Sequence, residues 1–150
     1  MIRRTFAIDS DLGRVAALAG EVSEACRSMH IAAADAILVE ICVVEAVNNA
    51  IEHAYREEPG HRVFVDLALD GERVTLEVRD RGARLCESKL ASARCADPTI
   101  EPLDSLPERG MGLAIMKEAM ERVAYTCAGG INTLSLSRRV ALTAGPSAPR

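Results

Sequence analysis

Of the 150 residues, 49% are hydrophobic and 27% are charged, with a net charge of −4, which is typical of one globular domain. The negative charge, without a block rich in Lys or Arg, argues against DNA or RNA as a partner, and no apolar run reaches the roughly 18 residues of a membrane span. Because the five cysteines form no Cys-x-x-Cys pair and no apolar signal segment follows the first residues, we expect reduced thiols and a cytoplasmic protein without membrane contact.

The first sixty residues predict one strand and two helices. Residues 2–8 alternate apolar and polar side chains, which is typical of a strand. The Asp-Ser-Asp sequence at 9–11 can cap a helix, and apolar residues then recur at helical spacing to about Met29. A second helix is predicted over 35–55, and it ends before the Pro-Gly pair at 59–60 because these residues cannot continue it.

The second predicted helix carries a set of polar residues on one face. Glu45, Asn49 and His53 are spaced four residues apart, so they would be stacked along the helix. Apolar residues occupy nearly all of the remaining circumference, which predicts a helix buried on most sides. Unpaired polar groups are costly there. Either a polar ligand or metal meets this face, or the C-terminal end of the helix emerges into solvent.

A hairpin and a long loop follow. The strand-like runs 63–69 and 73–79 flank an Asp-Gly pair, which predicts an antiparallel hairpin. Strict alternation in the second run indicates a sheet with one solvated side. Residues 83–108 show no sustained strand pattern, and loops of this length in compact domains are lids, binding loops or disordered segments.

The last third of the chain predicts one helix, two strands and a tail. The Gly-Met-Gly sequence at 110–112 opens a helix with apolar residues at helical spacing. Two strands are expected at 123–127 and 133–139, around a Gly-Gly turn. We expect residues 141–150 to be a disordered tail, so that the domain comprises residues 1–140.

Three short motifs need one explanation. They are Glu45-x-x-x-Asn49, Asp80-x-Gly82 and Gly110-x-Gly112-Leu113. Taken singly, each has an ordinary interpretation as a solvated helix residue, a turn or a flexible connector. Taken together, they fit a nucleotide: glycines before a helix let backbone N–H groups approach phosphates, an amide oxygen can bind Mg²⁺, and an Asp at a strand end can accept a hydrogen bond from a base amine.

Two segments carry a family resemblance. They are Glu-Ala-Val-Asn-Asn-Ala-Ile-Glu-His-Ala-Tyr at 45–55 and Glu-Arg-Gly-Met-Gly-Leu-Ala-Ile-Met at 108–116. They resemble the GHKL ATPases, and most closely the small serine-kinase anti-sigma factors of bacteria, over roughly residues 2–139. The resemblance implies an α+β fold with two layers, in which a mixed, mostly antiparallel sheet is covered by about three helices and a long lid closes over ATP.

The resemblance also implies roles for individual residues. Glu45 would be the general base and Asn49 the Mg²⁺ ligand. Asp80 would accept the hydrogen bond of the adenine amine, and Gly82 would give the base room. The other nucleotide contacts that it implies are Arg109, Gly110, Met111, Gly112, Leu113 and Thr133.

The sequence departs from the family pattern in two places. Residues 83–87 replace the second glycine, or the Phe-Asp-Pro, that often follows the adenine-binding Asp, and Asn132-Thr133 stands where Gly-Thr is usual. Arg109 could reach a γ-phosphate or remain a solvated charge. His53 is expected to be a structural residue rather than a catalyst.

By resemblance, the protein would be an ATP-dependent serine/threonine-protein kinase and anti-sigma factor. It would phosphorylate an anti-anti-sigma antagonist of the STAS type and sequester a sigma factor. The altered residues 83–87 motivate an alternative, a nucleotide-gated protein-binding regulator without significant kinase activity. A third hypothesis is an α+β scaffold that binds no nucleotide.

The resemblance also places the partner surfaces. The first helix, with Arg14 on its polar side, and the first strand would bind the sigma factor and form a homodimer. The strand at 2–8 would otherwise be an unprotected sheet edge.

Overall fold

The computed structural model describes residues 1–85 and 111–145. In these residues a five-stranded sheet has the order β1-β2-β3-β5-β4, and all of its neighbouring strands are antiparallel. The bounds are β1 Ile2–Asp9, β2 Arg62–Asp70, β3 Arg73–Asp80, β4 Arg122–Ala128 and β5 Ile131–Arg139. The α+β class is confirmed, but the expectation of a mixed sheet is wrong for the described strands.

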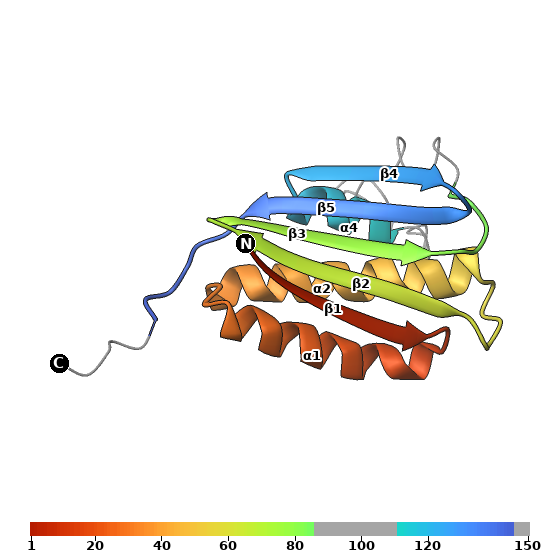
Figure 1. Cartoon of the computed structure of the whole chain (residues 1–150), viewed down its shortest axis with the longest axis horizontal. Helices are drawn as coiled ribbons and strands as arrows, with labels where there is room; N and C mark the ends of the chain where they lie inside the picture. The colour runs from red at the N-terminus through yellow and green to blue at the C-terminus, as the bar shows by residue number, and fades with distance from the viewer. Residues whose placement is uncertain (86–110, 146–150) are drawn as a thin grey trace, which may run out of the picture.

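The helices of the described residues lie on one face of the sheet (Figure 1). Their bounds are η1 Leu12–Arg14, a 3-10 turn; α1 Val15–Ser28; α2 Ala33–Asn49; η2 Ala50–Ala54, a π-helix; and α4 Met111–Ala119. The helix α2 packs against both α1 and α4. The two predicted layers are therefore present, with α2 in the middle of the helical layer. None of the described helices is long and apolar enough to cross a membrane.

The alternation of side chains explains why one sheet face is covered. In β3 the residues Val74, Leu76 and Val78 are buried, whereas Thr75 and Glu77 between them are partly exposed. Successive side chains of a strand point to opposite faces, so the apolar set meets the helices and the polar set meets solvent. The hairpin predicted from the Asp-Gly turn is confirmed, since β2 pairs with β3.

The predicted helix 35–55 changes its geometry after Asn49. The amide of Tyr55 donates to the carbonyl of Ala50 at 3.0 Å, the i→i−5 bond of a π-turn. A π-turn holds more residues than an α-turn, so it rotates the subsequent residues about the helix axis. Glu45 and Asn49 are partly buried, whereas His53 is exposed, so the polar residues reach solvent at the C-terminal end, as the second of the two alternatives expects.

Two predicted boundaries differ from the structure. The helix opened by the Gly-Met-Gly sequence ends at Ala119 rather than near residue 122. Beyond the domain end expected at residue 140, Leu142 forms an antiparallel bridge with Ile31, and the amide of Thr143 donates to the carbonyl of His30 at 2.7 Å. Residues 141–143 therefore belong to the fold, and not to a disordered tail as expected.

Candidate functional site

The Glu45-x-x-x-Asn49 motif and Gly112 of the third motif lie side by side where α4 begins next to α2. Glu45 and Asn49 lie one turn apart on α2, and Gly112 lies in the first turn of α4. A Cβ atom added to Gly112 would stand 2.6 Å from Oε2 of Glu45, and 3.5 and 3.6 Å from the amide nitrogen and oxygen of Asn49. A side chain at position 112 would therefore have to displace the carboxylate of Glu45, the mobile end of its side chain.

Glu45 is partly buried beside Gly112. Burial is the main reason why its pKa is raised, and the negative charge of Glu52 raises the pKa further. Both effects disfavour the ionised carboxylate. A raised pKa makes Glu45 a stronger base than an ordinary glutamate, which suits a group that must take a proton.

The first turn of α4 offers backbone donors to an anion. The amides of a helix N-terminus have no acceptor within the helix and carry the positive end of its dipole. Met111 is partly buried at this end, and Leu113 is buried in the core, where it anchors the turn. Two predicted residues of this motif, Arg109 and Gly110, lie outside the described residues.

Asp80 ends β3 on the sheet face that the helices cover. Its side chain is 9% exposed, and its Oδ1 accepts hydrogen bonds from the amide of Gly82 at 2.9 Å and from Nδ2 of Asn132 at 2.8 Å. Burial raises the pKa of Asp80, and these two hydrogen bonds lower it in part. Among the described residues none donates to Oδ2, which is therefore available to accept a hydrogen bond from a ligand.

Asn132 was not singled out from the sequence. It stands opposite Asp80 in the β3–β5 ladder and is 2% exposed. Its Nδ2 also donates to the carbonyl of Gly82 at 3.0 Å. One amide group thus orients the carboxylate and closes the turn behind it. The signal was available, because Asn132 shares its strand face with the apolar Leu134 and Leu136.

Thr133 does not belong to this site. It pairs with Arg79 of β3 and Thr126 of β4. Adjacent residues of a strand point to opposite faces, so Thr133 faces away from the helices while Asn132 faces Asp80. The prediction that Thr133 lies near an adenine is wrong for this reason.

Gly82 is needed for a backbone contact. A Cβ atom at this position would stand 2.3 Å from the carbonyl oxygen of Ala54, the last residue of η2. Next to it, the amide of Ala83 donates to the same oxygen at 2.8 Å. The glycine therefore lets the turn after Asp80 pack on the end of the helix that carries Glu45 and Asn49. Whether it also gives a base room stays a prediction.

Tyr55 fastens this junction. Its hydroxyl accepts from the amide of Arg81 at 2.7 Å and donates to the carbonyl of Arg62 at 2.8 Å. The ring stacks on His61, with centroids 4.5 Å apart. Beyond the turn, Leu85 donates its amide to the hydroxyl of Tyr125 at 2.8 Å. The described part of the altered segment 83–87 is thus held against the sheet.

The arrangement fits ATP and Mg²⁺ by its own chemistry. At one end it has Asp80, whose Oδ2 receives no hydrogen bond from a described residue; at the other it has helix amides beside Gly112, where a side chain would displace the carboxylate of Glu45. The amide oxygen of Asn49 is a hard ligand of the kind that Mg²⁺ prefers. Among the described residues no cluster of three His, Cys, Asp or Glu residues could hold a metal by itself, so the metal would also need phosphate and water ligands.

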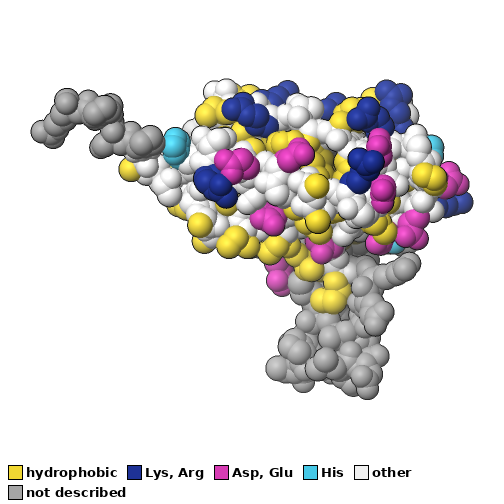
Figure 2. All heavy atoms as spheres, turned by 90° about the horizontal axis from the view of Figure 1, so that it is seen from below, with side chains coloured by type: hydrophobic (Ala, Val, Ile, Leu, Met, Phe, Trp, Pro, Cys, Tyr) yellow, Lys and Arg dark blue, Asp and Glu magenta, His cyan; other side chains and the backbone are white. Residues whose placement is uncertain are grey.

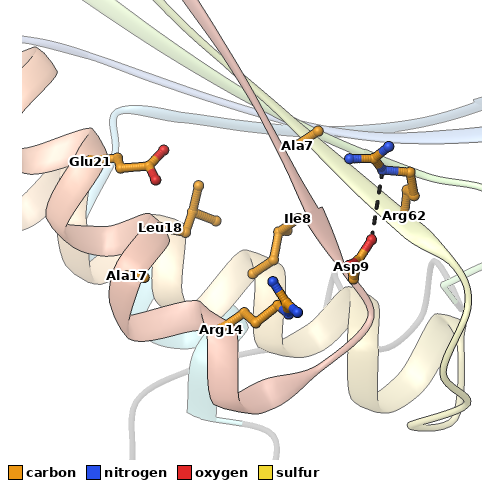
Figure 3. A pocket seen from close by; sticks show the side chains of 8 residues that line it. All are labelled: Ala7, Ile8, Asp9, Arg14, Ala17, Leu18, Glu21 and Arg62. Atoms are coloured by element: carbon orange, nitrogen blue, oxygen red, sulfur yellow. Dashed lines mark ion pairs between the residues drawn. The ribbon is translucent and has the colours of Figure 1, made fainter.

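Arg14 lies at a separate groove between β1 and α1 (Figure 3). The groove has a volume of about 210 Å³. Ile8 and Leu18, both buried, contribute its apolar side chains. Its charged residues are Asp9, Arg14, Glu21 and Arg62. Arg14 is well exposed and forms a loose ion pair with Asp11 at 3.7 Å.

Comparison with known proteins identifies relatives. The family model of the histidine kinase-like ATPase domain matches residues 8–138. An anti-sigma F factor of Oceanobacillus iheyensis is 31% identical over 85 residues, which are 57% of this chain and 56% of the relative. The serine/threonine-protein kinase BtrW of Bordetella bronchiseptica is 32% identical over 99 residues, 65% of this chain and 66% of the relative. The match thus spans little more than half of the first relative's length.

Two solved structures share the fold. One holds the RsbU and RsbW domains of a Mycobacterium tuberculosis protein; it has a TM-score of 0.65 and 18% identity, and the match covers 93% of this chain and 33% of that one. The other is the SiaB–SiaC complex of Pseudomonas aeruginosa, with a TM-score of 0.65 and 14% identity over 89% of this chain and 88% of that chain. At these identities the likeness concerns the fold alone.

Proposed function

This chain belongs to the histidine kinase-like ATPase family, and from that premise we propose that it is an ATP-dependent serine/threonine-protein kinase and anti-sigma factor. Its substrate would be an anti-anti-sigma protein of the STAS type, and its second partner a sigma factor. Names of relatives support this proposal, since they include an anti-sigma F factor and a serine/threonine-protein kinase. The observation that carries it is the position of Gly112, where an added Cβ atom would meet the side chains of Glu45 and Asn49.

In this proposal some residues bind the nucleotide and another carries out the chemistry. Oδ2 of Asp80 accepts a hydrogen bond from the adenine amine, while Asn132 holds Oδ1. The first-turn amides of α4 bind phosphate oxygens. The amide oxygen of Asn49 holds Mg²⁺, which when bound would neutralise phosphate charge. Because binding is assigned to these other residues, the carboxylate of Glu45 is left for the acceptor hydroxyl.

Glu45 acts on the protein that receives the phosphoryl group. Its carboxylate accepts the proton of a serine or threonine hydroxyl as that oxygen forms a bond to the γ-phosphorus of ATP and the bond to the ADP oxygen breaks. The partly buried position of Glu45 keeps the carboxylate weakly solvated, and its raised pKa favours proton uptake. Position and basicity together suit a general base.

The wild-type protein provides the first test. Incubated with Mg²⁺, γ-labelled ATP and a STAS-domain antagonist, it should transfer label to a serine or threonine of the antagonist, and chelation of Mg²⁺ should abolish transfer. An antagonist variant with alanine in place of the acceptor residue is the control and should remain unlabelled. ATP binding without transfer of the label would favour the nucleotide-gated regulator, the alternative suggested by the altered segment 83–87. No nucleotide binding at all would refute both.

Partner binding is proposed at the groove between β1 and α1. Figure 2 views the edge of the molecule that carries α1, and acidic and basic side chains are interspersed there with hydrophobic ones. Such a mixed surface suits a protein partner rather than a polyanion. β1 is an edge strand of the sheet, which also makes it a candidate for contact with a second copy of the chain.

Reversal of one groove charge tests this surface. Arg14→Glu should weaken binding of the antagonist or the sigma factor about tenfold or more, because it places a like charge where a complementary one is needed. Arg27→Glu is the matched control: Arg27 lies on α1, which begins directly after Arg14, is well exposed and pairs with Glu24. Calorimetry should find the ATP affinity of both variants unchanged. Equal partner binding by the two variants would remove Arg14 from the interface.

A further inference from the structure

A guanidinium joins α2 to α4 at the end far from Gly112. Arg138, near the end of β5, donates from Nη1 to the carbonyl of Ala119, the last residue of α4, at 2.7 Å. Its Nη2 lies 2.9 Å from Oδ1 of Asp35 in the first turn of α2. The two side chains are only 23% and 14% exposed. One side chain therefore contacts the end of one helix and the beginning of the other.

Each group in this junction is satisfied. The second oxygen of Asp35 accepts from the amide of Ala141 at 2.7 Å. The carbonyl of Ala119 is one of those that a helix leaves without an internal partner, and a positive charge beside it opposes the negative end of the helix dipole. A shielded ion pair of this kind differs from a solvated surface pair, because removal of one member leaves the other partly buried without its charged partner.

The two ends of α4 are therefore held against α2 in different ways. At its N-terminal end Gly112 lies so near Glu45 and Asn49 that an added Cβ atom would meet both, and at its C-terminal end Arg138 binds Ala119 and Asp35. The helix has nine residues, so it is about 13 Å long. A rigid element this short transmits a displacement of one end directly to the other.

The contact at Gly112 leaves little tolerance for such a displacement. Because a single added methyl group would stand 2.6 Å from Glu45, a shift of α4 along α2 either forces Glu45 aside or opens a gap beside the first-turn amides. Hydrogen bonds from these amides to an anion weaken steeply when distance or angle is lost.

We propose that Arg138 is a positioning residue of the nucleotide site, which fixes α4 along α2 so that Gly112 stays against Glu45 and Asn49. The proposal rests on the proposed function, because it assigns the affected ligand as the phosphates of ATP. Arginine is required because its planar fork reaches two acceptors at once, whereas the ammonium of lysine is a single compact charge on a flexible stem.

The test compares Arg138→Lys with Arg139→Lys. Arg139 is the next residue, is exposed and points to the other face of the sheet, so it controls for charge and strand position. Arg138→Lys should weaken Mg-ATP binding between about two- and thirtyfold, the range typical of coupling through a remote residue. Arg139→Lys should leave the affinity unchanged. Asp35→Asn should weaken Mg-ATP binding about as much as Arg138→Lys does. The double variant should lose less binding free energy than the two single variants lose together.

Hydrogen exchange in the nucleotide-free protein gives a second measurement. Amides of α4 should exchange faster in Arg138→Lys than in Arg139→Lys, while amides of β2 and β3 keep their protection. Faster exchange throughout the chain, with unchanged ATP affinity of the folded protein, would show that Arg138 only stabilises the fold and would overturn the proposal. If the wild type itself binds no ATP, the proposed function fails instead, which is a distinguishable result.

Discussion

Glu45→Gln is expected to lower phosphoryl transfer to the antagonist about 10²–10⁴-fold, the usual effect of removing a general base. Glutamine keeps the size and shape of glutamate beside Gly112, so the packing of α2 on α4 should survive. ATP affinity should change little, because binding is assigned to Asp80, Asn49 and the first-turn amides of α4. Single-turnover transfer of labelled phosphate measures the rate, and calorimetry with ATP measures the affinity.

Glu52→Gln is the matched control for this substitution. Glu52 lies on η2, and its charge is a secondary cause of the raised pKa of Glu45. Its neutralisation should lower the pKa of Glu45 without removing the base, so transfer should continue, with its pH profile moved toward acid. A wild-type transfer rate in Glu45→Gln would exclude Glu45 as the base. Failure of that variant to fold would make Glu45 a structural residue.

The wild-type pH profile follows from the same carboxylate. A general base works only when ionised, so transfer should fall as the pH is lowered through the pKa of Glu45. Because burial and Glu52 raise that pKa above the ordinary value for glutamate, the loss should begin at a higher pH than for a solvent-exposed carboxylate. In Glu45→Gln the residual rate should not show this acidic limb.

Asp80→Asn is expected to weaken ATP binding about ten- to hundredfold, which corresponds to the loss of one hydrogen bond to a charged group. Asparagine has one acceptor oxygen and one donor amide in place of two acceptors. If its oxygen keeps the bonds from Gly82 and Asn132, its amide must face the adenine amine, donor against donor. Titration with ATP and GTP measures the effect, and the preference of the wild type for ATP should shrink in the variant.

Asp66→Asn is the control for loss of a buried carboxylate. Asp66 is 8% exposed on the opposite face of the sheet, where Thr5 and Arg79 bind it. Its substitution should reduce the free energy of unfolding and leave ATP affinity unchanged. If the two variants bind ATP equally well, or if the wild type binds ATP and GTP alike, Asp80 does not recognise the adenine.

Local patterns in the sequence determined most of the elements. Alternation of Val74, Leu76 and Val78 with polar residues, together with the Asp-Gly turn, sufficed to predict the β2–β3 hairpin, because side-chain direction and turn geometry are short-range steric properties. The four-residue spacing of Glu45 and Asn49 placed both on one face of α2 for the same reason. Such features do not depend on distant parts of the chain.

The sequence also indicates which face of the sheet each residue of β5 points to, but the family resemblance leads to a different residue. The family resemblance points to Thr133 as a hydroxyl near the adenine, whereas the period-two alternation assigns Asn132 to the face of Leu134 and Leu136 and Thr133 to the other. The ladder with β3 then sets Asn132 opposite Asp80. Alternation along the strand is the better guide to which side chain reaches the site, because a shift of one residue moves a side chain to the opposite face.

Tertiary structure alone decided the remaining features. The π-turn at Ala50–Ala54 accompanies the packing of the Gly82 turn on the carbonyl of Ala54. The pair of Asp35 and Arg138 joins residues more than a hundred positions apart. No periodicity within a window of residues encodes either contact, because each depends on how separately formed elements pack. The sequence by itself thus determined which residue types the site could use, and the packing of α2, α4 and the sheet decided which of them meet.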